Sequence, residues 1–317
     1  MQKKQLGRSP LQVAPLMFGG NVFGWTIDEA TSFGLLDGFV FAGFNFIDTA
    51  DVYSRWAPGN QGGESETIIG KWMKARGNRD KVIVATKVGG DMGQGKKDIG
   101  KKWILEEVEN SLRRLQTDHI DLYQTHWDDE TTPVEETLEA YAELVRAGKV
   151  RVIGASNFSP ARLKASLEAS AKHGYPRYES LQPHYNLVER ERFEKELEPI
   201  CVENQLGVIN YYSLAAGFLT GKYRSEDDLN TSPRGGGAKK YLNERGLNLL
   251  ATLDAVAGEY HSTPATVAIA WLIARPSVTA PIASATSIGQ LDSLIAATKL
   301  ELSKDALERL DAASAWK

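Results

Sequence analysis

The sequence of 317 residues contains a single cysteine, Cys201, which excludes an internal disulfide and any metal site built from several cysteines. It has no apolar run long enough to cross a membrane as a helix. It also has no excess of basic residues, since 37 Lys and Arg stand against 41 Asp and Glu. Binding to nucleic acid needs clustered positive charge, which this composition does not provide. The N-terminus lacks the apolar core of a secretory leader, so we expect a cytoplasmic protein with neither nucleic acid nor membrane as a partner.

Short apolar runs rich in β-branched residues recur along the chain, and each is typical of a strand that is buried on both faces. An early strand is expected at residues 16–18, and the other seven are NFIDTA, KVIVATK, IDLYQTH, RVIGAS, ESLQP, GVINYY and TAPIAS. Segments with helical periodicity lie between them, at residues 28–42, 65–76, 103–115, 133–147, 160–173 and 192–204. The chain therefore alternates strand and helix through eight units.

Two of these helices carry start signals in the sequence. Pro133 and Pro160 suit the first helical turn, where the missing N–H costs nothing, and Thr132 and Ser159 are expected as their N-caps.

Strict alternation leaves two architectures, an open doubly wound sheet or a closed (β/α)₈ barrel. Polar or aromatic residues close almost every run, namely Asp48, Lys87, His126, Ser156, Asn157, Gln182, Tyr211 and Ser284. In a barrel these ends converge on one mouth, whereas an open sheet would spread them along an edge. The first strand is also not followed by a GxGxxG phosphate loop. We therefore predict one (β/α)₈ TIM-barrel domain that spans residues 1–317.

Two stretches of the chain lie outside the eight strand–helix units. Residues 2–15 are expected to form a hairpin that caps the bottom of the barrel, and residues 223–260 add loops and helices after the seventh strand. The second stretch contains SPRGGGAKKY, a basic glycine-rich segment that could fold over a ligand at the mouth.

Four polar side chains at the first strand ends can act together as a proton donor. Tyr53 has an ordinary pKa of about 10, and the ammonium of Lys87 should lower it. Asp48 can pair with Lys87, and His126 can orient a carbonyl oxygen. Taken singly, these residues are more commonly a cap, aromatic packing, a solvated charge and a core histidine, and only their occurrence together on consecutive strand ends favours a functional site. A metal is not expected, because Asp48 and His126 lack a third ligand and Lys87 would repel a cation.

The motifs FIDTADVY, VATKVGG, DLYQTHWDD, GKVRVIGASNF, LQPHYNL and FLTGKY resemble, in order and spacing, those of the aldo-keto reductase superfamily over essentially the full chain. The resemblance implies an NADP(H)-dependent oxidoreductase that reduces an aldehyde or ketone to an alcohol, or catalyses the reverse, by direct hydride transfer. It places the catalytic tetrad on Asp48, Tyr53, Lys87 and His126, with Tyr53 as general acid and base.

The same resemblance implies which residues contact the cofactor. Ser156, Asn157 and Gln182 would hold the nicotinamide carboxamide, and Tyr211 would stack on the ring. The remaining cofactor positions are Gly20, Asn21, Asp48, Tyr212, Ser213, Leu214, Gly217, Leu219, Gly221, Lys222, Arg234, Ser284, Thr286 and Gln290.

The chain departs from the family pattern where cofactor choice is decided. Tyr212 and Ser213 replace the common serine and proline, and Leu294 replaces a common asparagine. The basic residue that often reads the 2′-phosphate is replaced by Thr286 or Ser287. Arg234 is then either the phosphate contact or an exposed loop charge, so NADP(H) is expected and NAD(H) stays open as an alternative.

The substrate and the oligomeric state are left open by the sequence. Trp25, Trp56 and Trp127 are expected to wall the substrate site together with Tyr53 and His126, which suits several kinds of small carbonyl compound or alcohol. A second function, resembling that of channel-associated family members, is a cofactor-binding regulatory subunit with little turnover. The complete tetrad argues against it.

Overall fold

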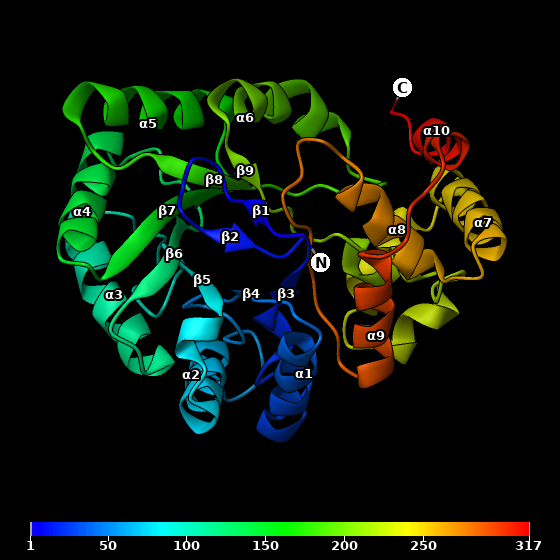
Figure 1. The fold of residues 1–317 in the computed structure, drawn as a ribbon, viewed down its shortest axis with the longest axis horizontal. Coiled ribbons are helices and arrows are strands. Elements are labelled where there is room, and N and C mark those ends of the chain that lie inside the picture. Colours follow the sequence, from blue (N-terminus) through cyan, green and yellow to red (C-terminus); the bar gives the residue numbers. More distant parts are fainter. Residues whose placement is uncertain (1, 317) are drawn as a thin grey trace.

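The computed structural model describes residues 2–316 and shows a curled sheet with helices packed around it (Figure 1). The sheet has eight parallel strands in the order β10-β3-β4-β5-β6-β7-β8-β9. Their bounds are β3 Met17–Gly19, β4 Phe46–Asp48, β5 Ile83–Val88, β6 Ile120–Thr125, β7 Val150–Ser156, β8 Tyr178–Gln182, β9 Gly207–Val208 and β10 Ile282–Ala283.

The two edge strands of this sheet approach each other and close the barrel. Val208 of β9 forms a parallel bridge with Val278, and the backbone N–H of Thr279 donates to the Val208 carbonyl at 2.8 Å. Ile282 of β10 donates in the same way to Asn210 at 2.9 Å. The predicted (β/α)₈ barrel is therefore confirmed.

A helix or a helix-bearing connection follows each strand and covers the outside of the barrel (Figure 1). These helices are α1 Glu29–Phe41, α2 Glu64–Arg76, α3 Lys101–Leu115, α4 Val134–Arg146, α5 Pro160–His173, α6 Glu198–Asn204, α8 Pro264–Ile273 and α9 Ile288–Ala297. A π-helical segment, Phe193–Leu197, runs directly into α6. In the part of the chain that the structure describes, no helix combines the length and apolar character that a membrane crossing requires.

The two predicted caps have different outcomes. Ser159 is the N-cap of α5, and its side chain accepts from the N–H of Arg162. The prediction for Thr132 is wrong, because the N-cap of α4 is Pro133 and no side chain caps that helix. The Thr132 hydroxyl instead donates to Asp129 at 2.9 Å and stabilises the preceding turn.

The N-terminal hairpin, β1 Lys4–Gln5 with β2 Gln12–Val13, closes the barrel from below, as predicted. Its fully buried Leu6 belongs to one apolar cluster with residues at the N-terminal ends of the strands, such as Met17 and Phe46. A Cβ on Gly207 would lie 2.5 Å from a methyl carbon of Leu6, so glycine is needed where β9 meets the hairpin. The bottom of the barrel is thus filled by side chains.

The additional segment after β9 passes through three short 3₁₀ turns, at residues 215–220, 227–231 and 235–241. It then forms the long helix α7 Glu244–Glu259, which packs against α8 and the final helix α10 Lys304–Ala313. A Cβ on Gly235 would lie 1.9 Å from the carbonyl oxygen of Leu229, which explains a glycine at this point. The expected loops and helix after the seventh barrel strand are confirmed.

Candidate functional site

Three polar side chains meet at the C-terminal mouth of the barrel. The Nζ atom of Lys87 lies 2.8 Å from the Tyr53 hydroxyl and 2.7 Å from Oδ1 of Asp48. The Tyr53 hydroxyl in turn donates to Oδ2 of Asp48 at 3.0 Å. Asp48 ends β4 and Lys87 lies one residue before the end of β5, so the parallel register brings them together.

Backbone hydrogen bonds in the segment after β4 place Tyr53 beside Asp48 and Lys87. The N–H of Thr49 donates to Ala85 at 2.8 Å and that of Asp51 donates to Lys87 at 3.2 Å, so the chain keeps following β5 beyond the end of β4. Tyr53 follows two residues later and its N–H donates to Ala50, which closes a turn.

The ammonium of Lys87 is completely buried and fully paired. It donates to the carbonyl of Thr49 at 2.8 Å as well as to Asp48 and Tyr53. Asp48 also accepts from Nε2 of Gln182 at 2.9 Å. A buried charge costs little only when its partners are all present, so this network fixes the position of each member.

The phenol of Tyr53 is held in its protonated form. Burial and the neighbouring carboxylate of Asp48 raise the pKa of Tyr53 well above its usual value. The lowering predicted from the sequence is therefore wrong, because it counted the ammonium and not the desolvation of the phenolate. Burial also lowers the pKa of Lys87, and the charge of Asp48 opposes that shift.

His126 follows β6 and faces the same cavity as Tyr53, with 6.0 Å between the ring centroids. Burial and the positive charge of Lys87 lower its pKa well below the ordinary value, so the imidazole is neutral at neutral pH. Its ring stacks on Trp127 with a centroid separation of 3.5 Å. Within residues 2–316, Nδ1 of His126 has no hydrogen-bond partner. A neutral imidazole can donate to a ligand oxygen from one ring nitrogen.

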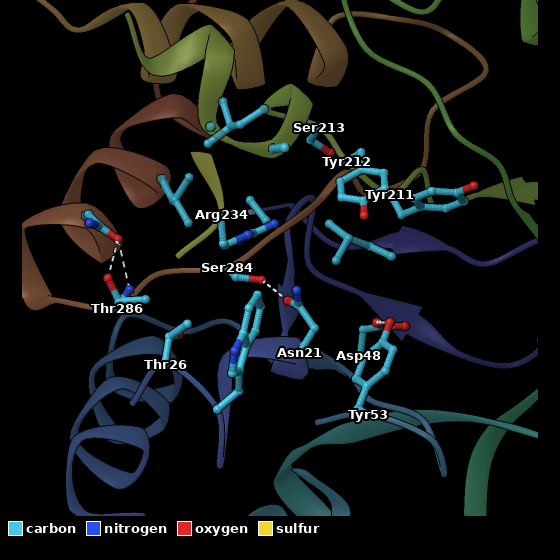
Figure 2. A pocket seen from close by; sticks show the side chains of 18 of the residues that line it. Asn21, Thr26, Asp48, Tyr53, Tyr211, Tyr212, Ser213, Arg234, Ser284 and Thr286 are labelled. Carbon is cyan, nitrogen blue, oxygen red and sulfur yellow. Dashed lines mark hydrogen bonds between the residues drawn. The ribbon is translucent and has the colours of Figure 1, made fainter. Parts of the chain in front are cut away.

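These side chains open into one cavity of about 930 Å³ (Figure 2). It is lined by Tyr53, Asp48, His126 and the three predicted tryptophans Trp25, Trp56 and Trp127. It is also lined by most of the predicted cofactor contacts, namely Asn21, Ser156, Asn157, Gln182, Tyr211, Tyr212, Ser213, Leu214, Gly217, Lys222, Arg234, Ser284, Thr286 and Gln290.

Three predicted cofactor positions do not line this cavity. Leu219 is completely buried in the main apolar core. Gly221 packs against the side chain of Arg224, and Gly20 lies against the carbonyl of Asp48. Sequence position alone could not separate them from their neighbours, because adjacent residues of a turn point in different directions.

A polar network spans the ends of β7, β8 and β9. The Tyr211 hydroxyl donates to Oδ1 of Asn157 at 2.7 Å, and Nδ2 of Asn157 donates to the carbonyl of His126 at 2.9 Å. The Ser156 hydroxyl donates to the Gln182 carbonyl at 2.9 Å. This side of the cavity therefore presents several hydrogen-bonding groups in fixed positions.

The opposite side of the cavity contains an unpaired positive charge. Figure 2 shows Arg234 projecting into the space between Thr286 and Tyr212. Burial lowers the pKa of Arg234, and no carboxylate within residues 2–316 forms an ion pair with it. Thr286 and Ser284 are bound internally, the first to Gln290 and the second to Asn21 (Figure 2).

The remaining wall is aromatic. The rings of Trp25 and Trp56 meet edge to face at 5.5 Å, and Trp56 meets Tyr53 at 5.9 Å. Gly90, in the turn after β5, borders Trp127. A Cβ on Gly90 would lie 3.2 Å from the indole and 3.0 Å from Val52. The VGG sequence thus leaves room for Trp127 in the wall.

The cavity is also lined by residues that were not expected from the sequence: Thr26, Val52, Ala216, Thr220, Ser232, Pro233, Thr263, Ala265, Ile282, Ala283 and Ser293. Ser232 and Pro233 adjoin Arg234 and could have been included with it. Thr263 and Ala265, at the start of α8, carry no signal in the sequence because only the closed barrel brings them to the mouth. Across residues 2–316, no group of three His, Cys, Asp or Glu side chains is arranged to hold a metal ion.

Comparison with known proteins agrees with this geometry. The model of the aldo/keto reductase family matches residues 15–315. The chain is 36% identical to the oxidoreductase YrpG of Bacillus subtilis, over 98% of this chain and 95% of that protein. It is 38% identical to the aldo-keto reductase YhdN of the same organism, over 87% of this chain and 81% of YhdN. A probable voltage-gated potassium channel subunit beta of Oryza sativa is 33% identical, over 92% of this chain and 89% of that protein. The chain therefore belongs to the aldo/keto reductase family of oxidoreductases.

Proposed function

We propose that this protein is an NADP(H)-dependent oxidoreductase that interconverts an aldehyde or ketone and the corresponding alcohol, with Tyr53 as general acid and base. The observation that carries the proposal is the contact of the Tyr53 hydroxyl with Lys87 at 2.8 Å on the wall of a cavity that His126 also lines. A protonated phenol beside a buried ammonium can release a proton to an oxygen that gains negative charge.

The cavity supports a dinucleotide as the cofactor. Its volume of about 930 Å³ is at the upper end for a ligand site and exceeds what a small carbonyl compound needs. Ser156, Asn157 and Gln182 would hold a carboxamide near Tyr53, with Tyr211 beside its ring. Arg234, which has no ion-pair partner in the described chain, would bind a phosphate at the other end.

Arg234 is the basis for proposing NADP(H) over NAD(H). A guanidinium can bind a phosphate through two parallel hydrogen bonds, whereas a ribose hydroxyl offers no charge to pair with it. If Arg234 binds the diphosphate bridge instead, the preference for NADP(H) disappears.

In carbonyl reduction each side chain at the mouth of the barrel then has a separate role. The nicotinamide, when bound, supplies a hydride to the carbonyl carbon. His126 donates a hydrogen bond to the carbonyl oxygen and orients it towards Tyr53. As the π electrons move onto that oxygen, Tyr53 transfers its proton to it and becomes a phenolate. Lys87 stabilises the phenolate, Asp48 holds Lys87 in place, and oxidation of the alcohol reverses each transfer.

A regulatory subunit with little turnover is the alternative function, and the potassium channel subunit from rice is the relative that suggests it. The complete proton-donor network favours turnover. We also propose a cytoplasmic location and a small carbonyl compound or alcohol as the partner besides the cofactor, with neither nucleic acid nor membrane.

The direct test is to incubate the purified protein with a reactive aromatic aldehyde and nicotinamide cofactor deuterated at C4 of the reduced ring, in NADPH and NADH forms. Deuterium in the alcohol product, with faster turnover on NADPH, is the expected result. Protein that binds the cofactor, seen by quenching of its tryptophan fluorescence, without reducing any aldehyde or ketone would support the regulatory subunit instead.

A further inference from the structure

The loop after β5, residues 89–100, places the exposed Lys97 against Trp127, a residue that lines the cavity, although Lys97 itself does not line it. Nζ of Lys97 lies over the Trp127 ring, 5.5 Å from its centroid. Trp127 lines the cavity and stacks on His126, so a single indole separates this ammonium from the histidine beside Tyr53. The positive charge of Lys97 also contributes to the lowered pKa of His126.

The carboxylates near Lys97 in the same loop already form ion pairs with other residues. Asp91, in the same loop, forms an ion pair with Arg55 at 3.4 Å. Asp98 pairs with Lys96 at 3.2 Å. Over residues 2–316, Lys97 itself has no ion-pair partner. An anion that arrived at this rim would therefore meet one uncommitted cation.

The carboxylates on the other side of Trp127 are committed as well. Asp128 accepts three hydrogen bonds from the guanidinium of Arg162, two at 2.8 Å and one at 3.0 Å, and its side chain is largely buried. Asp129 accepts from the hydroxyl groups of Thr131 and Thr132, at 2.7 Å and 2.9 Å. Neither carboxylate is in an ion pair with Lys97.

We propose that Lys97 selects carbonyl substrates that carry a carboxylate on an aromatic ring. The aromatic wall of Trp25, Trp56 and Trp127 would pack against the ring, with the reacting carbonyl directed to Tyr53 and the carboxylate directed to Lys97. This inference rests on the proposed function and adds its substrate class. Lys97 is a specificity-determining residue and takes no part in proton transfer.

The test compares 4-carboxybenzaldehyde with its methyl ester, which keeps the ring and the aldehyde and removes the charge. We expect kcat/KM of the protein to favour the acid about fivefold at low ionic strength, which is the upper range for an exposed ion pair. The preference should reside mainly in KM and should fall in 0.5 M salt, because exposed charges are screened at about that ionic strength.

Two variants assign the preference to one residue. In Lys97→Gln the ratio of acid to ester should fall to about one, while kcat for the ester stays unchanged. Lys96→Gln is the matched control, since it removes the adjacent lysine that is paired with Asp98, and it should keep the ratio of the parent. A Lys97→Gln protein that keeps the preference, or a parent that has none, overturns the proposal.

A binding measurement separates this inference from the proposed function. Benzoate and benzamide are titrated against the protein, and quenching of tryptophan fluorescence reports the two dissociation constants. Tighter binding of benzoate that is lost in Lys97→Gln supports the anion site even if no aldehyde is reduced. Equal binding of both compounds in parent and variant, with aldehydes still reduced, rejects the anion site and leaves the reductase proposal intact.

Discussion

The two ends of the same barrel strands differ sharply in what they bury. On β4, Phe46 belongs to the apolar cluster that the hairpin covers, and Asp48, two residues further and on the same face, forms an ion pair with Lys87. On β5 the same step leads from Ala85 to Lys87. The two residues of each pair lie about 7 Å apart along their strand. The interior of the barrel therefore changes from an apolar lower layer to a charged upper layer in a single step.

This difference shows how the fold divides stability from chemistry. The lower layer gains free energy from removing apolar surface from water. The upper layer buries charges and is tolerated because each donor of Lys87 meets an acceptor. Substitutions in the lower layer should mainly change stability, and substitutions in the upper layer should mainly change turnover.

Lys87→Met should give the largest effect, because this substitution in the upper layer should lower both stability and turnover. Removing the ammonium leaves Asp48 as a buried charge without its partner, which costs about 3–5 kcal/mol of the free energy of unfolding. It also removes the stabilisation of the phenolate, so we expect kcat to fall about a thousandfold. Urea unfolding and steady-state kinetics measure the two losses.

A double variant, Asp48→Asn with Lys87→Met, is the control for this prediction. It should regain part of the lost stability, because no charge is left unpaired, and regain none of the turnover. Recovery of both properties would show that the ion pair has no role in proton transfer.

Tyr53→Phe should reduce turnover by about a thousandfold, because the proton donor is lost, and lower the free energy of unfolding by about 1–3 kcal/mol, because one donor of the buried Lys87 loses its acceptor. Cofactor affinity, measured by fluorescence titration, should stay within about twofold. Tyr212→Phe is the matched control, since it removes a half-exposed phenol from the same cavity. A Tyr53→Phe protein that keeps a tenth of the activity would contradict the assigned role.

Phe46→Ala should lower the free energy of unfolding by about 3–5 kcal/mol, since it opens a cavity in the layer that the hairpin covers. The value of kcat/KM for the folded protein should change less than about threefold. Urea unfolding followed by circular dichroism, together with an assay at low temperature, tests both statements. A large catalytic loss at unchanged stability would erase the contrast between the two layers.

Arg234→Ala should raise KM for NADPH about tenfold and leave KM for NADH within about twofold, because a charge-assisted contact to the 2′-phosphate is lost only with the first cofactor. Lys239→Ala, which removes a lysine from the same segment that is paired with Glu226, should change neither constant. Equal losses with both cofactors would assign Arg234 to the diphosphate bridge.

The smallest effect is expected from pH. The pKa of His126 is lowered below 6.5, so the imidazole remains neutral above that value, and the pKa of Tyr53 is raised above 10.0, so the phenol remains protonated below it. Both groups are then in the required state throughout the neutral range. The kcat/KM for carbonyl reduction should vary less than about twofold between about pH 6.5 and about pH 9. A rate that falls with a midpoint near 7 would contradict a neutral His126.

Local patterns in the sequence determined the alternation of strands and helices, the hairpin at residues 2–15 and the polar residues at the strand ends. Each of these depends on neighbours within a few residues, as the cap that Ser159 provides for α5 illustrates. Once a barrel is inferred, Asp48, Lys87 and His126 must converge, because parallel strands all end at the same mouth.

Only the tertiary structure decided which side chains are desolvated and which residues from distant parts of the chain meet. Burial sets the direction of the pKa shift of Tyr53 against the expectation from its nearest charge. Packing also turns Leu219 into the core and brings Thr263, from the start of α8, to the cavity wall. Desolvation and contacts between distant segments arise from the closed barrel as a whole, so no local stretch of sequence encodes them.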